Sequence, residues 1–304
     1  MLDLLRRLPG HLFAVVDGAL APGAPLHLSD LDPRPLYLGG SGTASMMSGP
    51  HLVNCPTGHA LDLVRQAIPA EAIVWWSFPG ESAASAEETA FRHIRGLGMV
   101  EIPRNRPDAG ARTRAGGAEG YEAVLFRHAD PNVLVHLLPV MTPMQAARLL
   151  GEALAINFDA TRNGGLRHAA RPSDLPPAPT GLLRLELPQY LALTNARLHA
   201  SHVRIAAYLA RHRLEGMEHL DEAALLDIAK RSDASGRPLG LRSEKAHSRW
   251  AYLMMMTGGQ VAEDDTARDF VRSGPDPERR VRQLIDEAAA AIRRDGFASA
   301  GGAR

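Results

Sequence analysis

The chain has 304 residues, of which 45% are hydrophobic, and its 34 basic side chains balance its 34 acidic ones. This length and composition predict a folded core with room for two domains and exclude a disordered chain. The balanced charge favours neither nucleic acid nor an anionic membrane as a partner. The single cysteine, Cys55, excludes an internal disulfide and a cysteine-rich zinc site.

The sequence contains no predicted targeting or membrane-spanning segment. Its first residues, MLDLLRRLPG, include five apolar residues before Gly10, which is too few for a signal-peptide core. No run approaches the roughly 20 apolar residues that a membrane-spanning helix needs. We therefore expect a soluble cytoplasmic protein without a membrane partner.

Short apolar runs separated by turn residues occupy the first half of the chain. They predict the strands His11–Val16, Leu36–Leu38, His51–Asn54, Ala72–Phe78, Met99–Ile102, Val124–Phe126 and, as the last strand, Ala153–Phe158. Helical spacing predicts helices after Thr57, over Ser82–Arg95, from Pro131 and over Pro143–Leu150. Strands interleaved with helices predict an α/β (α+β) N-terminal lobe with a mixed sheet.

The second half shows helical patterns only. Four prolines in Arg171–Thr180 indicate a domain boundary, which divides the chain into an α/β domain at 1–170, a linker at 171–181 and a helical C-terminal lobe at 182–304. Helices are predicted along the apolar stripe from Leu191 to Leu209, after Asp221, Ser243 and Asp276, and around Ala267–Val271. Residues Ala298–Arg304 are expected to form a frayed tail.

The segment Tyr121–Pro143 combines a strand, a polar corner and a short helix. Asp130 precedes Pro131, a pairing that favours a helix start, because the carboxylate accepts free backbone N–H groups and proline has none to satisfy. Arg127, His128 and Asp130 form the corner between strand and helix. These side chains either bind a partner's backbone or carboxylates, or hold the fold together, with Asp130 capping the helix and Arg127 paired to a buried acid such as Asp17. We favour the structural role.

The corner sequence RHADP resembles the RxxDP signature of the effector chaperones, or adaptors, of bacterial type VI secretion, a family first catalogued as a domain of unknown function. The resemblance continues through LLPVMTPMQAARLLG and the early LFAVVDGAL, and it covers the first half of the chain better than the second. It implies a non-enzymatic carrier that holds a toxic effector protein in the cytoplasm and delivers it to the spike protein, VgrG. The glycine- and arginine-rich segment Arg104–Gly120, predicted to be a mobile loop, is longer than the corresponding connection in that family.

Three candidate chemical sites have a simpler structural interpretation. The glycine-rich Gly39–Thr43 lacks the residues of a P-loop, and Ser41 does not fit a nucleophile elbow. Cys55 lies between two histidines in sequence, but catalytic pairing depends on spatial geometry, and cysteine is commonly buried. His199 and His202 lie three residues apart without a third metal ligand at a recognised spacing, so we expect His202 to be a core histidine with satisfied hydrogen bonds.

Trp75 and Trp76 are adjacent on a predicted strand and must point to opposite faces. One ring is expected in the core, while the other faces either a covering helix or a partner, for which an exposed tryptophan would be a good anchor. Both remain candidate partner-binding residues, together with Arg127 and His128.

The sequence therefore predicts no catalytic residue, no cofactor and no metal site. It favours an effector chaperone with two protein partners, a type VI effector and VgrG. The alternatives are a small hydrolase that uses Ser41 or Cys55 and an arginine-rich nucleic-acid binder, which would need a basic face that the balanced charge does not predict.

Overall fold

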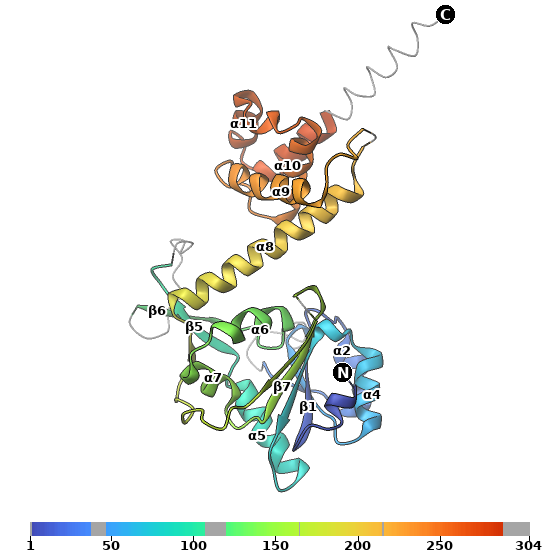
Figure 1. The fold of residues 1–304 in the computed structure, drawn as a ribbon, viewed down its shortest axis with the longest axis vertical. Coiled ribbons are helices and arrows are strands. Elements are labelled where there is room, and N and C mark those ends of the chain that lie inside the picture. The colour runs from blue at the N-terminus through green and yellow to red at the C-terminus, as the bar shows by residue number, and fades with distance from the viewer. Residues whose placement is uncertain (1, 38–46, 107–119, 164, 215, 288–304) are drawn as a thin grey trace, which may run out of the picture. The chain divides into compact units, whose positions relative to one another are not determined.

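A computed structural model describes residues 2–37, 47–106, 120–163, 165–214 and 216–287 (Figure 1). The chain divides into two compact units, Met1–Thr194 and Asn195–Arg304. The first unit contains the strands and the second is helical, so the predicted fold class is confirmed. In the part of the chain that the structure describes, no helix is both long and apolar enough to cross a membrane.

A six-stranded sheet forms the centre of the first unit, and every neighbouring pair in it is antiparallel. Its strands, in spatial order, are β2 (Arg34–Pro35), β3 (Pro50–Asn54), β1 (His11–Asp17), β4 (Ile73–Phe78), β7 (Ala155–Ala160) and β8 (Gly165–Ala170). Ala14 in β1 sits opposite Val53 on one side and Trp75 on the other, which fixes the register of the three central strands.

The two faces of this sheet bury two different cores. Phe13 and Val15 of β1 belong to one core, while Ala14 and Val16 belong to the other. This alternation follows from the two-residue period of a strand. Because helices cover both faces, the central strands carry apolar residues at successive positions rather than at alternate ones (Figure 1).

The first unit contains six described helices; the sequence predicts the last four of them, whereas the two short helices near the start of the chain were not predicted. The six are α1 (Leu2–Leu5), α2 (Ala24–His27), α4 (Gly58–Ala67), α5 (Ala83–Arg95), α6 (Pro131–Leu137) and α7 (Pro143–Leu150). Short 3-10 turns, η1 to η5, occupy Ser29–Leu31, Ala70–Ala72, Leu138–Val140, Thr161–Asn163 and Gln260–Ala262. The side chains of Thr57, Asp130 and Thr142 each accept a backbone N–H at a predicted helix start. Ser82, which the sequence places inside a helix, is instead the cap of α5.

A second, three-stranded sheet contains β5 (Met99–Pro103), which pairs antiparallel with β6 (Tyr121–Leu125) and parallel with β9 (Leu183–Arg184). Two strand predictions need correction. The strand predicted at Leu36–Leu38 is not found where the structure describes it. The short β2 ends at Pro35, Leu36 and Tyr37 follow it outside any strand, and Leu38 lies outside the described residues. The run ending at Phe158 is not the last strand either, because β8 and β9 follow it.

The proline-rich segment 171–180 lies within the first unit rather than between the units. Leu175 packs against the core that contains Trp76, and Leu183 and Leu185 are buried in that same core. The division between the compact units falls after Thr194, inside the long helix α8 (Leu187–Arg211).

The second unit has its own core around the fully buried Trp250. Besides the end of α8, it contains α9 (Glu222–Gly236), α10 (Glu244–Met256), α11 (Asp265–Arg272) and a helical segment at 277–287. Asp221 and Ser243 cap α9 and α10, as their positions in the sequence predict. The expected tail, 298–304, lies outside the described residues.

Candidate functional site

Arg127 holds two buried carboxylates at the corner between β6 and α6. One terminal nitrogen, Nη2, lies 2.8 Å from Asp17 Oδ2, and the other, Nη1, lies 3.3 Å from Asp130 Oδ2. The side chains of Asp17 and Asp130 are 7% and 8% exposed, whereas that of Arg127 is 45% exposed. The guanidinium therefore lies over two desolvated acids with part of its surface in solvent.

Asp130 has a second role at the start of α6. Its Oδ1 accepts the backbone N–H of Asn132 at 2.9 Å and the side-chain amide of the same residue at 3.1 Å. Pro131 occupies the first helical position, where its missing N–H costs nothing. One carboxylate thus caps a helix with one oxygen and pairs with Arg127 through the other.

Asp17 is fixed at the end of β1 by the turn that follows it. Its Oδ1 accepts the backbone N–H of Ala19 at 2.9 Å, which leaves Oδ2 for Arg127. Gly18 lies so close to the segment just before β3 that a Cβ on it would be 2.5 Å from the carbonyl oxygen of Met47. The tight turn therefore requires glycine, and it aims Asp17 at the corner.

Two aromatic side chains complete the corner, and the sequence reasoning missed one of them. Tyr37 donates its hydroxyl to the carbonyl oxygen of Phe126 at 3.0 Å, and its ring lies 6.4 Å from that of His128. Burial, and then the nearby Asp17, raise the pKa of Tyr37 to about 12, so the hydroxyl stays protonated and can donate. No spacing rule connects this residue to a segment ninety or so positions later, and only the fold brings them together.

His128 is fully buried and lies against the rings of Tyr37 and Phe126. Neither ring nitrogen has a hydrogen-bond partner among the residues that the structure describes. Burial lowers the pKa of His128 to about 4, and the opposing influence of Asp17 is smaller. His128 is therefore a neutral core residue, which corrects its prediction as a partner-binding residue.

Trp75 and Trp76 do point to opposite faces of the sheet, but both are buried, with 1% and 0% of their surface exposed. Trp75 packs in the core beneath α4, and Trp76 in the core beneath α5. The expectation that either ring serves as an anchor for a partner is wrong, because helices cover both faces of β4. Of the four predicted partner-binding residues, only Arg127 has a substantially exposed side chain.

Of the two candidate nucleophiles, Cys55 lies within the described residues and Ser41 does not. Cys55 is buried, and burial raises the pKa of its thiol to about 12, so the reactive thiolate is strongly disfavoured. His51 is buried and bonds through Nδ1 to the carbonyl of Gly49 rather than to Cys55. Ser41 and the rest of Gly39–Thr43 lie outside the described residues, as does 107–119 of the predicted loop.

The predicted core position of His202 matches its 8% exposure. Its Nε2, however, has no hydrogen-bond partner within the described ranges, so the expectation of a fully satisfied histidine is wrong. Across those same ranges, no group of three or more histidine, cysteine, aspartate or glutamate side chains could hold a metal ion.

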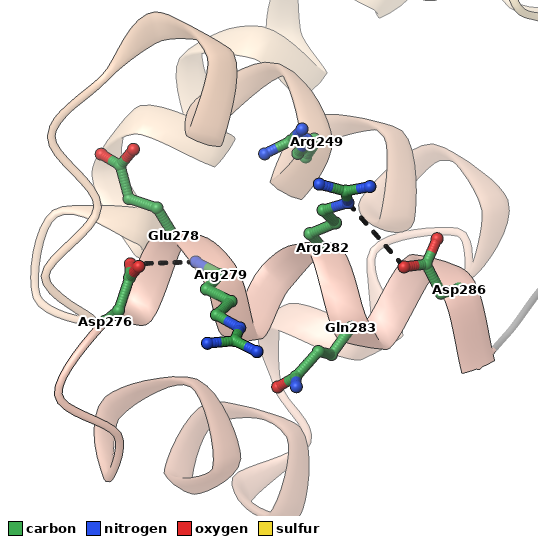
Figure 2. Close-up of a pocket in the computed structure, with 7 residues that line it drawn as sticks. All are labelled: Arg249, Asp276, Glu278, Arg279, Arg282, Gln283 and Asp286. Carbon is green, nitrogen blue, oxygen red and sulfur yellow. Dashed lines mark hydrogen bonds and ion pairs between the residues drawn. The ribbon is translucent and has the colours of Figure 1, made fainter.

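A pocket of about 580 Å³ lies in the second unit, along the helical segment 277–287 (Figure 2). It is lined by Arg249, Asp276, Glu278, Arg279, Arg282, Gln283 and Asp286. Asp276 accepts the backbone N–H of Arg279 at 3.0 Å, and Arg282 lies 3.9 Å from Asp286. Because the arginines and the carboxylates are equal in number, the lining has no net preference for a charged ligand.

Comparison with known proteins finds a family match in the first half of the chain. A family model described as "Domain of unknown function (DUF4123)" matches residues 12–148. The matched range contains the whole corner, from Asp17 and Tyr37 to Arg127, Asp130 and Pro131. No curated protein and no solved structure matches the chain.

Proposed function

We propose that the chain is an effector chaperone of bacterial type VI secretion, which binds a toxic effector protein and loads it onto the spike protein VgrG. The observation that carries the proposal is that the chaperone signature and the family match fall on the same part of the chain. The signature residues Arg127, Asp130 and Pro131, on which the resemblance to these chaperones rests, lie inside the range that the family model matches. The resemblance implies a family first catalogued as a domain of unknown function, and the matching model carries that description.

The geometry of the corner supports a structural role for the signature. Asp130 caps α6, and Arg127 joins this helix start to Asp17 at the end of β1. A sequence signature whose residues fix the packing of a helix against a central strand identifies proteins that share a fold. It does not indicate a catalytic reaction. The exposed part of Arg127 still offers N–H donors, because the guanidinium has five of them and its described contacts use only part of that set.

The alternative of a cysteine hydrolase has little support. A nucleophilic cysteine needs access to substrate and a lowered thiol pKa, whereas Cys55 is buried and its pKa is raised. A hydrolase that uses Ser41 stays an alternative, and an assay with a panel of generic esters distinguishes it from a carrier.

The proposal is tested by binding. We expect the full-length chain to form a stoichiometric complex with one toxin-like protein of the same bacterium, and to bind VgrG together with that protein, in size-exclusion chromatography of purified components. The same preparation should not hydrolyse the ester panel. Ester turnover that is lost in Ser41→Ala or Cys55→Ala, without complex formation, would replace the chaperone proposal with the hydrolase.

A further inference from the structure

A second pocket, of about 520 Å³, lies in the first unit between α5, the end of α7 and the segment that follows β8. We call it the arginine pocket, and its polar lining consists of Thr89, Arg92, His93, Arg148, Glu152 and Arg171. Its volume is in the range of small-ligand sites, which is about 300–1,000 Å³. Neither the corner nor the proposed function accounts for it.

Backbone carbonyl groups hold two of these arginines in place. Arg148 donates from Nε to the carbonyl of Gly181 at 2.7 Å and from Nη2 to that of Gly96 at 3.0 Å. Arg171 donates from Nη1 to the carbonyl of Gly151. A guanidinium has five N–H donors, so most donors on both side chains remain for a ligand.

The charges of these two arginines are not neutralised by an acid. Among the described residues, neither Arg148 nor Arg171 forms an ion pair, although Glu152 lines the same pocket. Burial lowers the pKa of Arg148, and no ion pair with a described carboxylate offsets that effect. Arg92 is different, because it pairs with Glu88 at 3.4 Å and its side chain is mostly in solvent.

His93 and Gly151 make one wall of the pocket rigid. His93 Nε2 lies 2.8 Å from the carbonyl oxygen of Leu149, and burial lowers its pKa, so the ring is neutral and adds no charge. Gly151 has a φ of +55°, and a Cβ on it would lie 2.2 Å from His93 Cε1. Only glycine fits against the imidazole, and the carbonyl that it presents there is the one that holds Arg171.

We propose that the arginine pocket binds an oxyanion, a carboxylate or phosphate group carried either by a small molecule or by an acidic polypeptide segment. Two prepositioned guanidinium groups without a carboxylate partner provide the planar donor geometry that such groups prefer. Backbone carbonyls already fix the side chains of Arg148 and Arg171. Ligand binding therefore does not lose the conformational entropy that ordering these long side chains would cost. The inference is independent of the proposed function.

The test avoids removing the arginines, since their contacts with the backbone also support the fold. Ala178 lines the pocket and is exposed, so Ala178→Glu introduces a competing carboxylate, and Ala178→Gln is its matched neutral control. Glu152→Gln removes the carboxylate already present. Each full-length variant is titrated calorimetrically at low ionic strength with inorganic phosphate, with succinate and with a short glutamate-rich peptide.

We expect saturable binding of at least one probe by the unmodified chain. Affinity should fall about tenfold or more in Ala178→Glu, should change by less than about threefold in Ala178→Gln, and should rise in Glu152→Gln. Tightest binding of phosphate or succinate identifies a small-molecule ligand, and tightest binding of the peptide identifies a polypeptide ligand. The proposal is overturned if no probe binds saturably, or if the glutamate and glutamine variants at position 178 bind equally well.

Discussion

Arg127 and Asp17 are 110 residues apart in the sequence, and their side chains meet at 2.8 Å. This contact joins the end of β1, near the beginning of the chain, to the segment that starts α6. Because Asp17 is almost completely buried, this ion pair is not an ordinary surface salt bridge. It fixes the position of α6 relative to the central sheet. The corner is therefore a long-range link within the fold.

Substitutions at the corner should destabilise the first unit to different extents. Asp130→Ala removes a helix cap and should lower the free energy of unfolding by roughly 1 kcal/mol. Arg127→Ala should cost more, about 2 kcal/mol, because it leaves the buried carboxylate of Asp17 without its cation, although partial exposure of Arg127 limits the loss. Urea denaturation of each variant measures both effects. Midpoints equal to that of the unmodified chain for both variants would contradict the structural role of the corner.

The thiol of Cys55 should be unreactive in the folded protein. Its burial and raised pKa leave a negligible thiolate population at about pH 8, so a thiol-specific reagent should react with it only after denaturation in urea. Cys55→Ala should retain the binding of any protein partner. Rapid labelling of the native chain would show that the thiol is accessible and would reopen the hydrolase alternative.

Glu278 should make the second unit sensitive to acid. It accepts hydrogen bonds from the side chain and backbone N–H of Ser243, both at 2.8 Å, and these contacts lower its pKa. A lowered pKa contributes stability that is fully present above the ordinary glutamate value of about 4.3 and is lost as the pH falls through the folded value. Hydrogen exchange of the α10 amides, corrected for intrinsic rates, should lose protection on acidification more steeply than in Glu278→Gln. Parallel pH profiles would contradict the assignment.

The first unit should fold without the second. A fragment of residues 1–194 retains its complete core, and its urea unfolding should be cooperative. A fragment of residues 1–170, which ends at the boundary that the sequence indicates, loses the buried Leu183 and Leu185. It should be less stable by several kcal/mol, since each buried leucine contributes about 2 kcal/mol. Equal stability of the two fragments would place the boundary at the proline-rich segment after all.

The local structure was largely predictable from the sequence, whereas the long-range contacts were not. The capping residues Thr57, Thr142, Asp221 and Ser243 each mark a helix start, because capping is chemistry between near neighbours. β8 was missed because an edge strand with mostly exposed side chains lacks an apolar pattern. β9 was missed because it has only two residues and depends on its pairing with β5.

The candidate site was predictable only in part, for the same reason. The residues Arg127, Asp130 and Pro131 lie close together in the sequence and could be recognised as a corner. Tyr37 enters the corner from a distant segment, and both tryptophans are covered by helices whose placement no periodicity indicates. No pattern in the sequence indicates the arginine pocket, because its cations come from three separate segments of the chain.

The proposed function requires this chain to carry a type VI effector. The most direct measurement is quantitative mass spectrometry of proteins secreted by the bacterium that encodes it, with and without the gene, in a background where type VI secretion is active. We predict that deletion removes one effector from the secreted fraction, leaves the other secreted components unchanged, and is complemented by the unmodified gene and by Cys55→Ala. An unchanged set of secreted effectors in the deletion strain would contradict the chaperone function.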